Sequence, residues 1–140
     1  AGIIWIILAA VLLIYPKTRK TGIIVAAALI VDLILCNVIL KNLIARTRPY
    51  DINTAVQIII AKPHDYSFPS GHTAASFASV AALYLAGAKK GWKIAGVLAV
   101  LIAFSRLYFY VHFPTDVLGG IVFGILSGVI GYEIVKKKIG

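Results

Sequence analysis

Apolar residues fall into five runs that are separated by short polar stretches. The runs cover Ala1–Tyr15, about Thr21 to Leu43, about Gly71 to Ala88, Trp92–Tyr110 and Thr115–Val135. A helix needs about 20 predominantly apolar residues to cross the hydrocarbon core of a bilayer, and the last four runs come near that length. The pattern predicts an all-α fold, an integral-membrane helical bundle with five transmembrane helices that form a single domain over residues 1–140.

The composition strengthens this prediction. Hydrophobic residues make up 61% of the chain and the mean hydropathy is +0.95, whereas soluble globular domains are nearer half apolar. The sequence opens on Ala1 and contains no methionine, so we expect that an N-terminal portion of the protein precedes it. A cleaved signal peptide is disfavoured for the first run, because no basic residues come before it.

The net charge of +9 is concentrated in clusters at the ends of the apolar runs. A nucleic-acid interface would gather basic residues along one stripe, so we expect no nucleic-acid partner. Nine basic residues follow the first, third and fifth runs: Lys17, Arg19, Lys20, Lys89, Lys90, Lys93, Lys136, Lys137 and Lys138. If the runs alternate across the bilayer, these nine lie on one side, which the positive-inside tendency makes cytoplasmic. Three polar stretches of the chain then face the opposite side.

The first polar stretch, at the end of the second run, carries Lys41 and Arg48 seven residues apart. On a helix this spacing places both cations on one face, and Pro49 then discourages helix at Arg48. Two cations at the end of a membrane helix suit an anionic lipid headgroup. The alternative is that they only extend to the lipid interface, which fits Arg46 better because it points to another face.

The second stretch, Pro69-Ser70-Gly71-His72, directly precedes the third run. Ser70 is typical of a helix N-cap, and Gly71 lets a ligand approach the backbone closely. The first N–H groups of the helix would point at an anion, which the helix dipole also attracts. His72 would lie in the first turn beside that anion, although many helices begin with a similar sequence.

The third stretch has Ser105-Arg106 at the end of the fourth run, and His112 and Asp116 around the start of the fifth. Asp116 follows His112 by four residues, within reach of a hydrogen bond. A carboxylate on one imidazole nitrogen fixes the tautomer and exposes the other nitrogen as a nucleophile. The planar guanidinium of Arg106 is suited to hold two phosphate oxygens. The alternative is an Asp that caps the helix beside an interfacial His.

Together the three stretches resemble the complete signature of the type 2 phosphatidic acid phosphatase superfamily. The pattern Lys-x6-Arg-Pro, Pro-Ser-Gly-His, Ser-Arg-x5-His-x3-Asp occurs in the family's order over Lys41–Asp116. The resemblance implies a metal-independent phosphatase without a cofactor, acting through a phosphohistidine intermediate. It implies that His112 is the nucleophile, that Asp116 orients it, and that His72 protonates the leaving group and later activates water. It also implies five residues that bind the phosphoryl oxygens: Lys41, Arg48, Ser70, Gly71 and Arg106. Membrane members of the family usually have six spans, so one N-terminal span is expected to be missing.

Charge alone points to the same chemistry. Phosphoryl transfer spreads negative charge over three oxygens, and catalysis is mostly positioning and electrostatic stabilisation. Fixed cations and a helix N-terminus supply both. The remaining acidic residues, Asp32, Asp51, Asp65 and Glu133, are scattered, so we expect no carboxylate cluster that binds a metal ion. The expected function is hydrolysis of a phosphate monoester or diphosphate on a membrane lipid headgroup, at the periplasmic or extracytoplasmic face of the cell or inner membrane.

Two other functions are alternatives. A non-catalytic membrane protein that binds lipid headgroups predicts a missing nucleophile or acid, yet both histidines are present. A vanadate-dependent haloperoxidase has a related site but is soluble, which the apolar runs oppose. Among lipid phosphates, undecaprenyl diphosphate and phosphatidylglycerol phosphate are favoured over phosphatidic acid and lipid A phosphate, without a residue that decides between them.

Three features outside the motifs also carry expectations. Asp32 and Asn37 lie inside the second run, where an acidic residue is a functional candidate. A helix–helix polar contact is favoured for Asp32, because it lies nearly three turns from Lys41. Glycines at four-residue spacing in the fifth run predict close packing in the bundle, with a homo-oligomer face as the alternative. The segment from Asp51 to Pro69 is equally consistent with an interfacial lid and with a plain surface loop.

Overall fold

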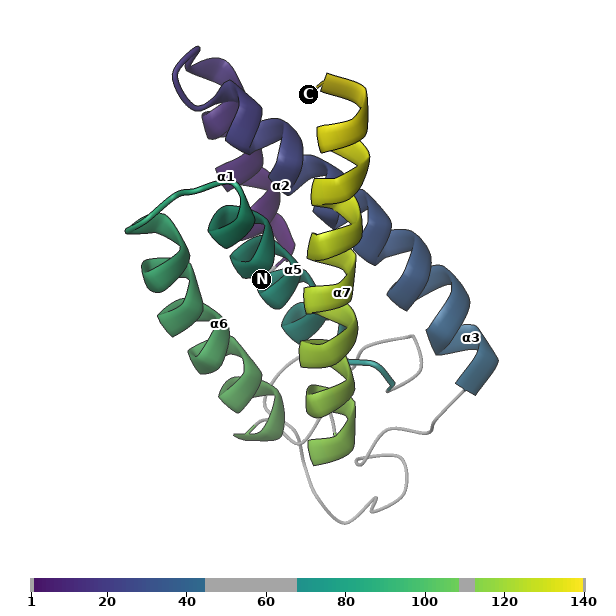
Figure 1. The fold of residues 1–140 in the computed structure, drawn as a ribbon. Helices are drawn as coiled ribbons and strands as arrows, with labels where there is room; N and C mark the ends of the chain where they lie inside the picture. The colour runs from purple at the N-terminus through teal and green to yellow at the C-terminus, as the bar shows by residue number, and fades with distance from the viewer. Residues whose placement is uncertain (1, 45–67, 109–112, 140) are drawn as a thin grey trace.

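The computed structural model describes residues 2–44, 68–108 and 113–139, which form helices and no strand. The helices are α1 (Gly2–Ile14), α2 (Arg19–Asp32), η1 (Leu33–Leu40), α3 (Lys41–Ile44), α5 (Gly71–Leu85), α6 (Gly91–Tyr108) and α7 (Pro114–Ile139) (Figure 1). Because α2, η1 and α3 follow one another without a break, five helical rods correspond to the five apolar runs. The predicted all-α bundle is therefore confirmed.

The rods differ in length more than the sequence predicts. Within the described ranges, three are long and apolar enough to cross a membrane: Arg19–Ile44 with 26 residues, Gly91–Tyr108 with 18 and Pro114–Lys138 with 25. By contrast, α1 has 13 residues and α5 has 15. The third run was thus expected to give a longer helix than it does.

A glycine cap explains why α5 ends early. Gly87 has a φ of 86°, a conformation in which a side chain is strained. Its N–H donates to the Tyr84 carbonyl at 3.1 Å, and the Ala88 N–H donates to the Leu83 carbonyl at 3.0 Å. These two bonds form the usual glycine-terminated end of a helix, although apolar residues continue beyond it.

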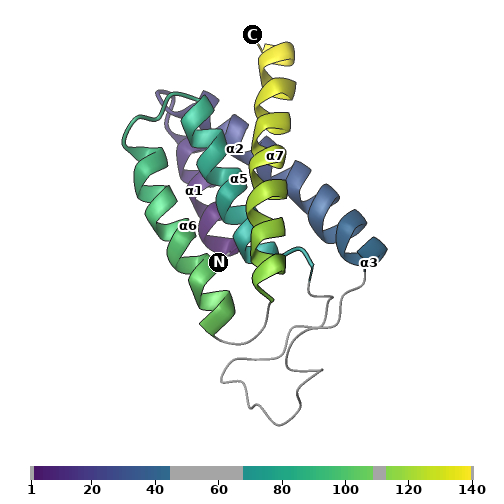
Figure 2. The same cartoon turned by 60° about the horizontal axis from the view of Figure 1, so that its bottom comes forward.

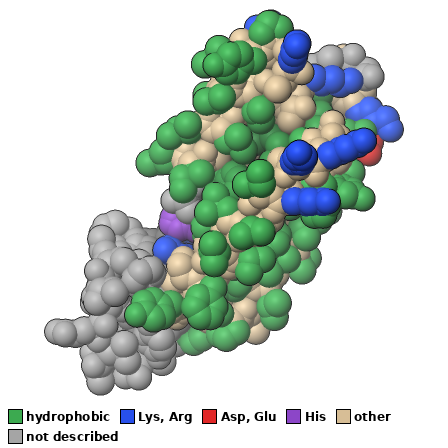
Figure 3. All heavy atoms as spheres, turned by 90° about the vertical axis from the view of Figure 1, so that its left-hand side faces the viewer, with side chains coloured by type: hydrophobic (Ala, Val, Ile, Leu, Met, Phe, Trp, Pro, Cys, Tyr) green, Lys and Arg blue, Asp and Glu red, His purple; other side chains and the backbone are tan. Residues whose placement is uncertain are grey.

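Helix α5 lies at the centre of the bundle, where it contacts α1, α2, α6 and α7 (Figures 1 and 2). Its buried residues are mostly small: Thr73, Ala74, Ala75, Ser76, Ala78, Ser79, Ala82 and Leu83. A helix surrounded by protein needs neither a wide apolar surface nor the full thickness of the bilayer. Helix α6, in contrast, exposes large apolar side chains such as Ile94, Val97 and Phe104, and apolar side chains cover much of the face in Figure 3.

Glycines allow α7 to pack directly on α5. A Cβ atom built on Gly120 would lie 2.9 Å from the Ser70 carbonyl oxygen, and one on Gly128 would lie 2.7 Å from that of Ala78. A Cβ on Gly124 would collide with the backbone of Ala74. The glycines predicted to pack within the bundle do so, since only a residue without a side chain permits this approach.

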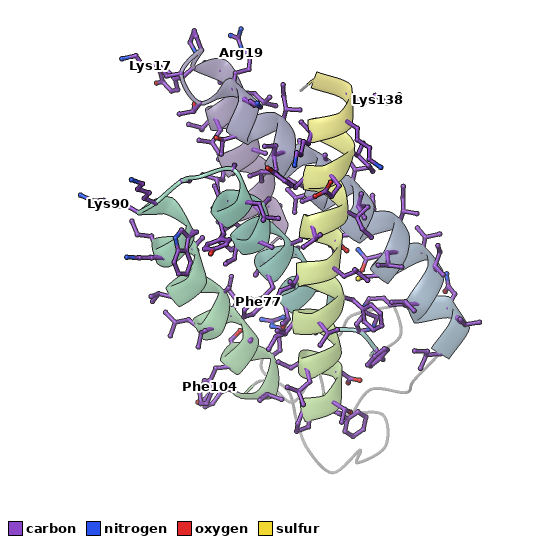
Figure 4. All side chains as sticks on the ribbon, in the orientation of Figure 1. Lys17, Arg19, Phe77, Lys90, Phe104 and Lys138 are labelled. Atoms are coloured by element: carbon purple, nitrogen blue, oxygen red, sulfur yellow. The ribbon has the colours of Figure 1, made fainter. Side chains whose placement is uncertain are left out.

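The two ends of the bundle carry different groups. Lys17, Arg19, Lys90 and Lys138 lie toward one end (Figure 4). Because successive helices alternate in direction, the C-terminal end of α3 and the N-terminal ends of α5 and α7 lie toward the other (Figure 1). The described parts of the three polar stretches, which we call the first, second and third motifs, belong to this second end. We call it the motif end.

Candidate functional site: a buried anion site at the motif end

Ser70 caps α5, as the sequence predicts. Its Oγ accepts a hydrogen bond from the Thr73 N–H at 3.4 Å and donates one to Thr73 Oγ1 at 2.9 Å. Both side chains are fully buried. A helix start leaves its first N–H groups without intrahelical acceptors, here those of Gly71 and His72, and the helix dipole makes this end attractive to anions. The predicted contact of the Ser70 hydroxyl with a phosphoryl oxygen stays a prediction, because the hydroxyl takes part in the cap.

Lys41 meets this helix start from the neighbouring helical segment. A Cβ atom built on Gly71 would lie 3.9 Å from Lys41 Nζ, 3.8 Å from Lys41 Cε and 3.3 Å from Asn37 Oδ1. Lys41 is only 3% exposed, which is rare for a lysine. A buried cation beside the positive end of a helix favours an anion between them. The first and second motifs, separated by 29 positions between Lys41 and Ser70, thus converge on one point.

Asp116 shapes the start of α7. Its side chain is fully buried, and Oδ2 accepts a hydrogen bond from the Phe113 N–H at 2.7 Å. Asp116 is therefore the acidic residue of a helix cap that reaches back to the residue before the helix. This bond fixes one carboxylate oxygen and agrees with the capping interpretation. The predicted bond to His112 stays a prediction, because His112 lies outside the described residues.

A backbone hydrogen bond joins the second and third motifs. The Ser70 N–H donates to the Asp116 carbonyl at 3.0 Å. Phe68, two residues before Ser70, packs its ring against Gly119 and lies edge-on to Phe123, with 6.3 Å between ring centroids. These contacts fix the start of α5 relative to the start of α7, so a ligand at one helix start also lies near the other.

His72 lies in the first turn of α5 and is half-buried. Its carbonyl accepts a hydrogen bond from Ser76 Oγ at 2.6 Å, and Ser76 Oγ in turn accepts one from Trp5 Nε1 at 2.9 Å. Trp5 is fully buried and reaches α5 from α1. This chain of bonds holds the turn that carries His72, a role that the sequence alone did not assign to Trp5 or Ser76.

The remaining predicted site residues are less completely described. Arg106 lies in the last turn of α6, is half-buried, and donates from Nε to Ser105 Oγ at 3.3 Å. Arg48 and His112 lie outside the described residues, as do positions 51–67 of the proposed lid. In the ranges that are described, no three His, Cys, Asp or Glu side chains are grouped closely enough to hold a metal ion.

Polar residues inside the membrane-spanning part of α2 and η1 form a second cluster. The Cys36 thiol hydrogen-bonds to the Asp32 carboxylate and lies within hydrogen-bonding reach of Ser127 on α7. The hydrogen bond of Asp32 is thus to a residue of its own helical rod, and Cys36 is the residue that reaches α7, so a helix–helix polar contact of Asp32 itself stays a prediction. Oδ1 of Asp32 and Oδ1 of Asn37 are buried without a hydrogen-bond partner in the described structure. Sequence reasoning noticed Asn37 but missed its place beside Lys41, for which the four-residue spacing was the available signal.

The fold and this site define a membrane-embedded helical protein in which a buried lysine lies beside a helix start at one end. The chain belongs to the PAP2 superfamily, whose sequence model matches residues 20–139. The resemblance seen in the motifs is thereby confirmed over most of the chain.

Named relatives and solved structures agree with this membership. The chain is 36% identical over 121 residues to the undecaprenyl-diphosphatase of Sulfolobus acidocaldarius. The aligned region covers 86% of this chain and 58% of the relative. It is 42% identical over 102 residues to phosphatidylglycerophosphatase B of Bacillus subtilis, and this aligned region covers 66% of this chain and 47% of the relative. The chain spans about half the length of these relatives.

Two crystal structures share the fold. The transmembrane PAP2-type phosphatidylglycerolphosphate phosphatase from Bacillus subtilis matches with a TM-score of 0.70 at 33% identity, over 96% of this chain and 68% of that one. LpxE of Aquifex aeolicus matches with a TM-score of 0.78 at 29% identity, over 95% of this chain and 78% of that one. The helical arrangement described above is thus that of known membrane proteins.

Proposed function

We propose that the protein is an integral-membrane lipid phosphatase, which hydrolyses a phosphate monoester or diphosphate on a lipid headgroup through a phosphohistidine intermediate. The observation that carries this proposal is the convergence of Lys41 on the first turn of α5, at Gly71. The Ser70–Asp116 backbone bond brings the start of α7, where the third motif ends, to the same place. The names of the relatives, which are phosphatases of lipid substrates, support it.

In the first step, the phosphoryl group lies between the cations and the start of α5. The imidazole of His112 attacks phosphorus, and the bond from phosphorus to the leaving oxygen breaks. His72 gives its proton to that oxygen, so the lipid leaves as an alcohol or as a lipid monophosphate. Asp116 holds the imidazole of His112 in the tautomer that presents a free nitrogen.

In the second step, His72 acts as a general base instead of a general acid. It takes a proton from a water molecule, whose oxygen attacks the phosphohistidine and breaks the phosphorus–nitrogen bond. Inorganic phosphate leaves, and both histidines return to their starting states. Lys41, Arg48 and Arg106, with the N–H groups at the start of α5, stabilise the charge on the three non-reacting oxygens in both transition states.

The proposed active site faces away from the cytoplasm. The support is the distribution of charge: basic side chains outside the motifs gather at the end of the bundle that is opposite to the motif end (Figures 3 and 4). Such clusters favour the cytoplasmic side of a membrane. The lipid tails would then remain in the outer half of the bilayer while only the headgroup enters the site.

Undecaprenyl diphosphate and phosphatidylglycerol phosphate are the substrates that we favour. Both are lipid phosphates of the kind named in two of the relatives.

Phosphate release by the detergent-solubilised protein tests the proposal. The substrates are these two lipids, phosphatidic acid and lipid A phosphate, each with and without EDTA. We expect release from at least one lipid, unchanged by EDTA. A protein that binds these lipids but releases no phosphate would be a headgroup-binding protein. Loss of activity with EDTA, restored by Mg²⁺, would contradict the metal-independent reaction.

A further inference from the structure

The helical segment that leads to Lys41 carries polar groups to which the proposed reaction gives no role. Asp32 is 3% exposed, and Oδ1 of both Asp32 and Asn37 is buried without a hydrogen-bond partner among the described residues. A buried acceptor without a donor is costly, and polar residues inside membrane helices commonly serve function. Of the two, Asn37 is the closer in sequence to the proposed site.

The π-helical form of η1 affects which face of the helix these groups occupy. Asp32 and Lys41 are nine residues apart, about two and a half turns of a regular α-helix, which would put them on opposite faces. Yet both are buried. The Lys41 N–H donates to the Cys36 carbonyl, five residues back, and such bonds make a helix turn less per residue. This change moves Lys41 toward the buried face that carries Asp32 and Cys36.

Cys36 anchors this face to the rest of the bundle. It is fully buried, it bonds to Asp32, and it lies against Ser127 of α7. The hydroxyl of Ser127 is itself tied to the Phe123 carbonyl at 2.7 Å. The contact with α7 therefore fixes the segment from Cys36 to Lys41 at its Cys36 end. Asn37 directly follows Cys36 in the chain.

Asn37 is directed at the same point as Lys41. Measured from a Cβ atom built on Gly71, Asn37 Oδ1 lies at 3.3 Å and Lys41 Nζ at 3.9 Å. The amide oxygen of Asn37 is thus the atom of this segment nearest to this Cβ position at Gly71, closer than the Lys41 ammonium. An acceptor in this place, beside a cation, fits a hydrogen bond to the ammonium group better than it fits packing alone.

We propose that Asn37 is a positioning residue for Lys41. Its buried amide oxygen, which has no donor among the described residues, accepts a hydrogen bond from the Lys41 ammonium once an anion is bound at the start of α5, and thereby directs the ammonium at that anion. The proposal rests on the proposed function, because it assigns a partner to a cation of that site. An ammonium group has three N–H donors on a flexible chain. In a buried site, each donor that does not face the anion needs another acceptor.

The neutral amide suits this task better than a carboxylate. A carboxylate at position 37 would pair with Lys41 and repel the incoming anion. An amide orients the ammonium while leaving its full charge to act on the phosphoryl oxygens. Asp32 lies five residues before Asn37 in the chain, so a carboxylate there is further along the helix from Lys41 than one at position 37 would be.

Binding of orthovanadate, measured by isothermal titration calorimetry on the solubilised protein, tests the inference without requiring turnover. Vanadate resembles the five-coordinate transition state of phosphoryl transfer. The variants are Asn37→Leu, which removes the acceptor, and Asn37→Asp, which keeps the shape and adds a charge. Asn42→Leu is the matched control, since Asn42 is exposed on the same helix and its amide donates to the Val38 carbonyl at 2.8 Å.

We expect Asn37→Leu to weaken vanadate binding about tenfold, since hydrogen bonds to charged groups are the stronger class. Asn37→Asp should weaken it further, and Asn42→Leu should change it less than twofold. The effect of Asn37→Leu should largely disappear in a Lys41→Met background, because the two residues act as a pair. The proposal would be overturned if Asn37→Leu weakened vanadate binding equally in the wild-type and Lys41→Met backgrounds. Normal vanadate binding by Asn37→Asp would also overturn it. If the wild-type protein binds vanadate but releases no phosphate from any lipid, the proposed function fails while this test still decides the role of Asn37.

Discussion

The motif end and the basic end of the bundle use the same residue types in opposite environments. Lys41, at the motif end, is 3% exposed and lies against the start of α5. Lys17, Lys90 and Lys138, at the other end, are exposed. An exposed lysine at a membrane surface costs little and its charge is screened. A buried lysine is costly unless its charge is compensated, and this burial is one reason why we propose a chemical role for Lys41.

Among substitutions at the two ends, loss of the proposed nucleophile at the motif end should reduce activity the most. We expect His112→Ala to reduce phosphate release by a factor on the order of 10³ or more, because no other side chain would carry the phosphoryl group. Steady-state release from the preferred lipid measures the effect. Substantial remaining activity would mean that water attacks the substrate directly.

The proton donor should show its role through the choice of substrate. His72→Ala should slow hydrolysis of a lipid phosphate about 10² to 10⁴-fold, since the leaving oxygen needs a proton. Hydrolysis of an aryl phosphate with a stable phenolate leaving group should slow much less. The ratio of kcat/KM for the two substrates is the measurement, and equal losses would assign His72 to phosphate positioning instead.

A matched pair of lysine substitutions compares the two ends directly. Lys41→Met keeps much of the apolar side chain and removes the charge, so kcat/KM should fall about 10² to 10³-fold, as for other groups that stabilise transition-state charge. Lys90→Met removes an exposed charge from the basic end and should change kcat/KM less than twofold. Similar losses in both variants would show that burial does not distinguish the functional cation.

Packing between α5 and α7 should matter for stability more than the lipid-facing side of α6. Gly124→Leu places a side chain against the Ala74 backbone and should destabilise the protein by about 3 kcal/mol or more. Gly96→Leu is the control, because nothing lies within 4 Å of a Cβ atom on Gly96. Thermal unfolding in detergent should show a lowered midpoint for the first variant only. A similar midpoint in both would mean that the glycine contact is not needed for the close approach of the helices.

Local signals in the sequence were enough for much of this architecture. Five apolar runs predicted five helical rods, and the Ser70 cap at the start of α5 followed from the residue type at a helix boundary. The length of α5 was wrong because apolar residues continue past Leu85, and only the backbone conformation of Gly87 ends the helix. Hydrophobicity does not distinguish the end of a helix from the end of an apolar run.

The arrangement of the site depended on contacts that a linear sequence does not contain. The motifs predicted which residues would gather, and the structure brings Lys41, Gly71 and Asp116 to one end. The π-helical form of η1 has no signature in Leu33–Leu40, so the distance from Asp32 to Lys41 was judged on a regular helix. The place of Asn37 beside Gly71 follows from how two helices meet, which only the folded structure specifies.

Reaction of introduced cysteines with an impermeant thiol reagent in intact cells tests most directly whether the motif end faces away from the cytoplasm. The background is Cys36→Ser, which removes the native thiol and keeps a hydrogen-bond donor beside Asp32. A cysteine at Asn53, between the first and second motifs, should react in intact cells. A cysteine at Lys90, in the basic end, should react only after the membrane is opened. The reverse pattern would place the site on the cytoplasmic leaflet and contradict the account.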